Sequence, residues 1–145
     1  QEGFISVDDK IQDYLGPAYA TQGKDDVTIL NCLVHNTGYP PDPSPEYWDP
    51  VFGCEGAPLP ETLSFNCSNH IYEALLNQTL DRPINTKYVY SDLSMITLMY
   101  VVGQVVSDHG LVDEADLLPQ CGSPAFPLDG IGRQCFYEAF VRTHV

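Results

Sequence analysis

Three residues that can take part in catalysis, Tyr90, Ser91 and Asp92, open the most apolar stretch of the chain, residues 87–110. A phenol can act as a general base or proton relay when its surroundings favour the phenolate, and a carboxylate can accept hydrogen bonds from a substrate. If a helix begins here, its free N–H groups and its dipole favour negative charge on such a phenol. Ser91 suits the N-cap of that helix. The plainer alternative is that Tyr90 is an aromatic packing residue in a loop.

Two further aromatic residues, Tyr39 and Trp48, lie in a loop rich in proline and could line a substrate cleft. A surface loop held by a disulfide is an equally good interpretation of this segment. His35, at the end of a predicted helix, is expected to cap the last carbonyl groups of that helix. The four histidines share no metal-ligand spacing and the aspartates are scattered, so we expect no metal. We expect no cofactor either.

The five cysteines form a pattern of two flanked loops and one isolated thiol. Cys54 and Cys67 flank the Pro-rich loop, and Cys121 and Cys135 flank a second loop rich in Gly and Pro. We therefore predict two local disulfides, and a buried free thiol at Cys32, which lies in an apolar run. The chain contains no C-x-x-C pair, so a zinc ribbon or a thioredoxin-like motif is not expected.

Two N-glycosylation sequons begin at Asn66 and Asn77. Together with the cysteines they predict N-glycans and a secreted or lumenal location, because disulfides persist in oxidising compartments. The sequence starts at Gln1 rather than at Met, and no signal peptide is visible in it. We therefore expect a processed or partial piece of a longer protein.

The charge of the chain limits its partners. It carries 6 Lys and Arg against 20 Asp and Glu, which gives a formal net charge of −14. Nucleic acid and anionic membrane surfaces both attract basic patches, so we expect neither as a partner. The length of 145 residues suits one domain that can bury a real core.

Apolar periodicity and capping signals predict a mainly α chain with long irregular loops. The expected helices cover residues 7–15, 27–35, 68–77, 91–108 and 132–144. Ser6, Asp26 and Ser68 are the expected caps of the first three helices. The residues expected to face the core are Val7, Ile11 and Leu15 in the first helix and Ile29, Leu30, Leu33 and Val34 in the second. The expected loops are the Pro-rich 39–67 and the Gly/Pro-rich 111–132.

The helix expected at 91–108 is about 18 residues, or roughly 27 Å, which approaches the length of a membrane span. Four polar residues interrupt it: Ser94, Thr97, Gln104 and Ser107. A transmembrane helix requires about 20 mostly apolar residues. We therefore predict a core helix that is buried on most sides, and no membrane span.

Four segments of the chain resemble the serine β-lactamase-related hydrolases. They are "GFISVDDKIQDYL", "VTILNCLVHNTGYP", "YVYSDLSMITLMYVVGQVV" and "CFYEAFVRTHV". This family includes class C β-lactamases, D-Ala-D-Ala carboxypeptidases, esterases, D-aminopeptidases and a filament-forming mitochondrial protein. The resemblance rests on three family landmarks in matching order, "G-x-[IL]-S-[LV]-D-D", "L-L-x-H-T-S-G" and "Y-S-N". It implies that Tyr90 takes the proton of a nucleophilic serine and that Asp92 is a polar group on the substrate side.

The sequence departs from the family in its other catalytic motifs. Family enzymes carry S-x-x-K upstream of this segment and K-T-G or H-x-G on a strand downstream, and neither motif occurs here. Thr21 and Lys24 have the S-x-x-K spacing with Thr in place of Ser, but they follow the wrong landmark. Asp92 replaces the Asn of the better-known enzymes, and an ionised Asp accepts hydrogen bonds but donates none. The substrate could therefore be an ester rather than a β-lactam or peptide.

Residues 1–145 are accordingly expected to form one partial domain, the helical middle of an α+β β-lactamase/transpeptidase-like fold. The resemblance implies a secreted serine hydrolase that acts on an amide or ester through an acyl-enzyme in the full-length parent, while this chain alone is inactive. Its partners would be the remainder of the parent polypeptide or other subunits of an assembly. One alternative is a catalytically inactive relative with a structural or assembly role, and a second is an unrelated extracellular binding module held by disulfides.

Overall fold

The computed structural model describes residues 3–46, 49 and 67–145, and the regular elements in these ranges are helical. The α-helices are, in chain order, α1 (Gln12–Leu15), α2 (Ile29–Leu33), α3 (Ser68–Asn77), α4 (Asp92–Asp108) and α5 (Gly130–His144). The short 3-10 helices are η1 (Thr21–Gly23), η4 (Glu114–Asp116) and η5 (Pro119–Cys121). The described ranges contain no β-strand, and an isolated bridge joins Lys10 to Thr28. The prediction of a mainly helical chain with long loops is confirmed.

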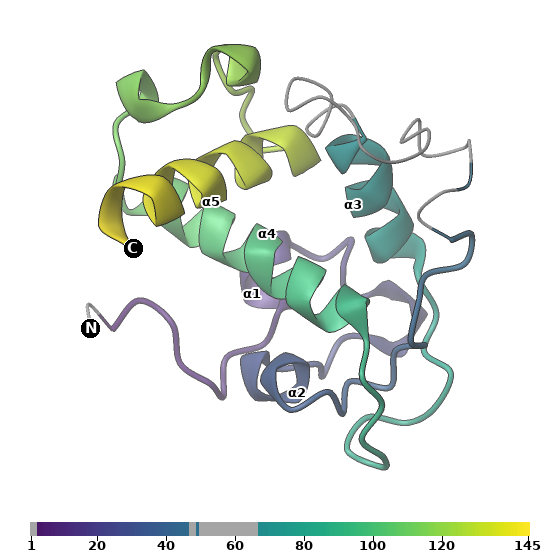
Figure 1. The fold of residues 1–145 in the computed structure, drawn as a ribbon. Coiled ribbons are helices and arrows are strands. Elements are labelled where there is room, and N and C mark those ends of the chain that lie inside the picture. The colour runs from purple at the N-terminus through teal and green to yellow at the C-terminus, as the bar shows by residue number, and fades with distance from the viewer. Residues whose placement is uncertain (1–2, 47–48, 50–66) are drawn as a thin grey trace.

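Helix α4 forms the centre of the fold. Figure 1 shows α5 lying along it, and α1 and α2 also pack on it. Its side chains Leu93, Tyr100 and Val101 are almost completely buried, and so are the polar Ser94 and Thr97. The Thr97 hydroxyl donates to the backbone oxygen of Leu93 at 2.7 Å, which satisfies this group inside the helix. Nowhere in the described part of the chain is a helix both long enough and apolar enough to cross a membrane.

Helices α4 and α5 approach each other closely at Gly103. A Cβ atom at this position would lie 1.9 Å from the backbone oxygen of Arg133, so only glycine fits without a shift. Arg133 is almost fully buried, and its guanidinium lies 4.7 Å from the ring centre of Tyr72, from α3. The guanidinium also donates to the backbone oxygen of Leu128. The contact thus joins three helices around one buried cation.

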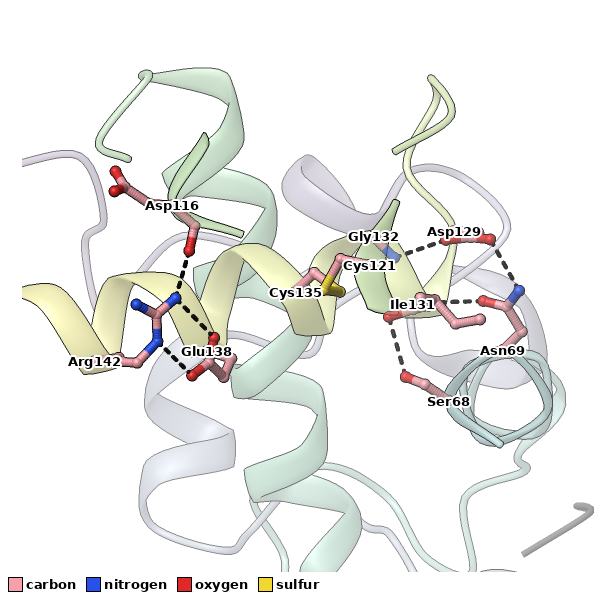
Figure 2. Close-up of a disulfide and its surroundings, with 11 residues drawn as sticks. Ser68, Asn69, Asp116, Cys121, Asp129, Ile131, Gly132, Cys135, Glu138 and Arg142 are labelled. Atoms are coloured by element: carbon pink, nitrogen blue, oxygen red, sulfur yellow. Dashed lines mark hydrogen bonds and ion pairs between the residues drawn. A yellow bond between two sulfur atoms is a disulfide. The ribbon is translucent and has the colours of Figure 1, made fainter. Parts of the chain in front are cut away.

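The start of α5 is fixed by polar groups of its own cap and of α3 (Figure 2). Asp129 is the N-cap, and its Oδ1 accepts from the N–H of Gly132 at 2.8 Å. Its Oδ2 accepts from Asn69 Nδ2 at 2.9 Å, while Asn69 Oδ1 accepts from the N–H of Ile131 at 2.8 Å. Ser68 donates to the backbone oxygen of Gly130 at 3.1 Å. These bonds satisfy the free groups of a helix N-terminus and orient α3 against α5.

The disulfide predicted between Cys121 and Cys135 is confirmed, and it joins η5 to α5 (Figure 2). Cys32 is a free thiol with no exposed surface, also as predicted. Cys67 is disulfide-bonded, and its predicted partner Cys54 lies outside the described residues. The Arg142 side chain also holds α5 to the loop before it. It donates hydrogen bonds to Glu138, on the same helix, and to the backbone oxygen of Asp116, in η4.

Lys24 is a fully buried cation whose hydrogen bonds go to carbonyl groups. Its Nζ donates to the backbone oxygens of Leu76 at 3.0 Å and Gln78 at 2.6 Å, at the C-terminal end of α3. A cation is favourable there because it faces the negative end of the helix dipole. Desolvation nevertheless lowers the pKa of Lys24 from 10.5 to about 8, because burial disfavours the charged form.

The first two predicted helices are shorter than expected, and part of their apolar surface faces outward. Helix α1 begins at Gln12 rather than at Val7, whose side chain is 47% exposed. The expected cap at Ser6 forms instead a local turn, in which its N–H donates to Asp9 Oδ2 at 2.7 Å. Helix α2 covers Ile29–Leu33 and is capped by Thr28 rather than by Asp26. The side chains that were expected in the core but are exposed on this segment are Leu30, Leu33 and Val34.

The later helices agree more closely with the predictions. Helix α3 matches the expected 68–77, although Cys67 occupies the N-cap position in place of Ser68. Helix α4 has Ser91 as its N-cap, as expected. Helix α5 begins at Gly130, two residues before the expected start, because Asp129 caps it.

Candidate functional site

The residues Tyr90, Ser91 and Asp92 lie against the loop that follows α2. The N–H of Val89 donates to the backbone oxygen of His35 at 2.9 Å. The N–H of Asp92 donates to the backbone oxygen of Pro41 at 3.3 Å. The start of α4 is therefore held by backbone bonds to a segment about fifty residues earlier in the sequence.

His35 is the side chain that joins the two segments most directly. Its Nδ1 accepts a hydrogen bond from the N–H of Ser91 at 3.2 Å. Its ring centre lies 4.7 Å from that of Tyr90 at an interplanar angle of 37°, and 5.8 Å from that of Tyr88 in an edge-on contact. Because Nδ1 accepts, a neutral imidazole in this position carries its proton on Nε2.

Tyr90 presents its phenol to solvent. The side chain is 60% exposed, and its hydroxyl forms no hydrogen bond within the described ranges. Asp92 is the first residue of α4 and is partly exposed. An acidic residue in the first turn is favourable, because it faces the positive end of the helix dipole. Tyr90 and Asp92 thus place an available phenol and a carboxylate beside one helix N-terminus.

Ser91 occupies the N-cap position but does not cap the helix with its side chain. It has no exposed surface, and its Oγ has no hydrogen-bond partner. Its backbone oxygen accepts from the N–H of Ser94 at 3.2 Å. Solvent does not reach this hydroxyl, so the predicted contact of Ser91 with a substrate would need a rearrangement of the site.

Tyr39, expected at a substrate cleft, belongs to the core in this structure. It is 1% exposed, and its hydroxyl lies 2.6 Å from that of Tyr19 and 3.5 Å from Thr97 Oγ1. Burial raises the pKa of the Tyr39 phenol well above its ordinary value, which keeps it neutral. This position argues against direct contact with a substrate. Trp48, the other expected substrate contact, lies outside the described residues.

The remaining predicted sites are placed only in part. Asn77 is exposed at the last position of α3, and its Nδ2 donates to the backbone oxygen of Glu73 at 2.9 Å. Asn66, the other predicted glycosylation site, lies outside the described residues. Across the described ranges, no group of three or more His, Cys, Asp or Glu side chains is arranged to hold a metal ion.

The contribution of His35 was missed in the sequence, where a role as a helix C-cap was expected. The structure ends α2 at Leu33 with Val34 as its C-cap, and His35 follows with a positive φ of 53°. The sequence did contain one indication that His35 belongs to the site, because the "HNTG" and "YSD" segments both match landmarks of the same family. That signal did not reveal that the imidazole and the Ser91 backbone meet.

Residues 1–111 match the Beta-lactamase family model. The chain belongs to the beta-lactamase family. No curated protein and no solved structure gives a significant match to it. The matched range of this beta-lactamase family chain contains α1 to α4, and with them His35, Tyr90 and Asp92. Helix α5 and its disulfide lie beyond the matched range. The resemblance of the sequence to serine β-lactamase-related proteins is thereby confirmed.

Proposed function

We propose that residues 1–145 supply the helical part of a beta-lactamase family serine hydrolase that acts on an amide or ester. Two observations support this proposal. The family match covers the segment around Tyr90. Tyr90 directly precedes the N-cap of α4, its side chain is exposed, and its ring lies against that of His35. The position of Tyr90 is the single observation that carries the catalytic interpretation.

In the proposed reaction, a serine outside these 145 residues is the nucleophile. Its oxygen forms a bond to the carbonyl carbon of the substrate, and its proton passes to the oxygen of Tyr90, which must begin the step as the phenolate and becomes the neutral phenol. The bond from that carbon to the leaving nitrogen or oxygen then breaks, and the leaving group takes the proton from Tyr90. Water repeats the sequence in the second half, so that the acid product and the free serine are regenerated.

Asp92 would contact the substrate from the first turn of α4. Its carboxylate can accept a hydrogen bond from an N–H or O–H group of the substrate, but when ionised it cannot donate one to a carbonyl oxygen. This restriction favours amide or ester substrates that carry an N–H or O–H donor near the scissile bond.

The alternative proposal is a catalytically inactive family member with a structural or assembly role. It is favoured by Asp92 in place of the family Asn. Membership of the family sets aside the interpretation as an unrelated extracellular module. Both remaining proposals include the remainder of the parent polypeptide, or other subunits, as partners of residues 1–145.

A fluorophosphonate probe for reactive serines, applied to the full-length protein, separates the two proposals. The hydrolase proposal expects covalent labelling of one serine, and a Tyr90→Phe variant that is labelled about 100-fold more slowly, because proton transfer contributes about 10²- to 10⁴-fold. Tyr88→Phe is the matched control, since Tyr88 is similarly exposed and also contacts His35. Absence of labelling would favour the inactive relative, whereas labelling at equal rates in both variants would refute the role of Tyr90 as the base.

A further inference from the structure

The N–H of Ser91 depends on His35 for its hydrogen bond. Ser91 is fully buried, and its own hydroxyl, which often bonds a backbone group at an N-cap, has no partner. Its N–H donates to Nδ1 of His35, at 3.2 Å. A buried N–H that loses its acceptor is costly, so this bond restrains the backbone immediately after Tyr90.

His35 is itself held in an uncommon backbone conformation. Its φ of 53° lies in the left-handed region, which few residues other than glycine adopt readily. The surrounding framework fixes this conformation. Asn31 Nδ2 donates to Asn36 Oδ1 at 2.9 Å and to Asn85 Oδ1 at 2.8 Å, and the N–H of Asn85 donates to the backbone oxygen of Asn36 at 2.9 Å. The imidazole therefore projects from a rigid support toward α4.

We propose that His35 is the positioning residue of this site, and that its Nδ1 fixes the Ser91 backbone and thereby places the Tyr90 phenol beside the N-terminus of α4. The inference rests on the proposed function of Tyr90. The same imidazole that accepts the Ser91 bond packs against the Tyr90 ring, with the two ring centres 4.7 Å apart. Because the imidazole is rigid, the bond that fixes its Nδ1 also fixes the ring face that contacts Tyr90. His35 itself takes no proton from the nucleophile.

Two substitutions separate the hydrogen bond from the ring contact. His35→Asn keeps an acceptor, Oδ1, at the same distance along the side chain as Nδ1, and Asn tolerates a positive φ. His35→Phe keeps an aromatic ring against Tyr90 but has no acceptor. In the full-length protein we expect fluorophosphonate labelling to slow on the order of 10- to 100-fold in His35→Phe, because a misplacement of about 1 Å costs that much. Labelling of His35→Asn should stay within about threefold of the wild type, because its acceptor is retained.

Amide hydrogen exchange at Ser91 provides a readout that does not depend on activity. We expect exchange to be faster in His35→Phe and close to wild type in His35→Asn. Equal exchange and equal labelling in all three proteins would overturn the inference, as would equal impairment of both variants. If no form of the protein is labelled, the proposed catalysis fails, while exchange still decides whether His35 holds this backbone.

A measurement on the wild-type protein covers the case in which His35→Phe does not fold. The ¹⁵N chemical shifts of the His35 imidazole distinguish its two neutral tautomers. An acceptor at Nδ1 requires the tautomer with the proton on Nε2. Observation of the other tautomer in the neutral ring would remove the acceptor and with it the inference.

Discussion

Replacement of Gly103 by alanine tests how closely α4 and α5 approach. In an open helix this change would stabilise the protein by about 0.8–1 kcal/mol, because alanine is the better helix former. Here the new Cβ would lie 1.9 Å from the oxygen of Arg133, 2.7 Å from its carbonyl carbon and 3.0 Å from its Cα. All three atoms belong to the backbone, so no side-chain rotation can relieve the contact.

The helices must therefore separate by about 1 Å or more, which disrupts the packing around them. Overpacking of this kind typically costs about 1–3 kcal/mol, and backbone contacts belong at the upper end. After subtraction of the propensity gain we expect Gly103→Ala to lower the free energy of unfolding by about 2 kcal/mol. The corresponding fall in Tm is roughly 4–8 °C for a chain of this size.

Urea and thermal unfolding, followed by circular dichroism, measure this effect. Ser107→Ala is the matched control, because Ser107 lies one turn further along α4, is partly exposed and tests helix propensity alone. We expect a gain of a few tenths of a kcal/mol for that control. A Gly103→Ala protein as stable as the wild type, or more stable, would refute the reasoning about the helix contact.

Three further predictions concern other parts of the chain. Replacing Cys121 and Cys135 together by alanine should cost about 3 kcal/mol in urea titrations, as expected for a loop of about 15 residues, and reductant, which also opens the Cys67 disulfide, should cost the wild type at least as much. Lys24 has a folded-state pKa of about 8, against 10.5 in the unfolded chain, so stability should rise between about pH 8 and pH 10 as the buried charge is lost. Lys24→Met should flatten this rise in chemical denaturation, whereas an unchanged pH profile would contradict the role of Lys24. If Asn77 carries a glycan, enzymatic deglycosylation of protein expressed in eukaryotic cells should reduce its mass, and Asn77→Gln should make that shift smaller by one glycan.

The parts of the fold that the sequence predicted well are those with strong and local signals. Helix α4 has a long apolar run, which a buried helix accommodates. Helix α5 begins within two residues of its expected start, directly after its N-cap Asp129. The disulfide between Cys121 and Cys135 follows from two cysteines that flank one loop.

The short helices were predicted less well because their apolar residues do not report which neighbour covers them. Val7 and Leu33 fit a helical stripe, yet both are about half exposed in the described part of the chain. Apolar residues that recur every 3.6 positions identify the apolar face of a helix, but they do not show whether another element covers that face. Thr28 was missed as a cap because Asp26, two residues earlier, is an equally good capping residue type.

For the candidate site, the sequence identified Tyr90 and Asp92 but not the residue that supports them. His35 and Ser91 are 56 positions apart, and their contact depends on the loop after α2 returning to the start of α4. Tyr39 illustrates the opposite error, because an aromatic side chain next to prolines suits a cleft and a core equally well. Its hydrogen bond with Tyr19, deep in the core, is a long-range pairing that local sequence does not encode.

The disulfide between Cys121 and Cys135 closes a covalent ring of residues 121–135, which contains the exposed Phe126 and the start of α5. A protease that cuts once inside this ring leaves two fragments joined by the sulfur bond. Such a nicked protein would migrate as one band on a non-reducing gel and as two bands after reduction. Helix α5 would stay covalently joined to η5 after a cut before Asp129, so the loop around Phe126 is the part of this segment where an inserted tag or protease site would leave the capped start of α5 unchanged.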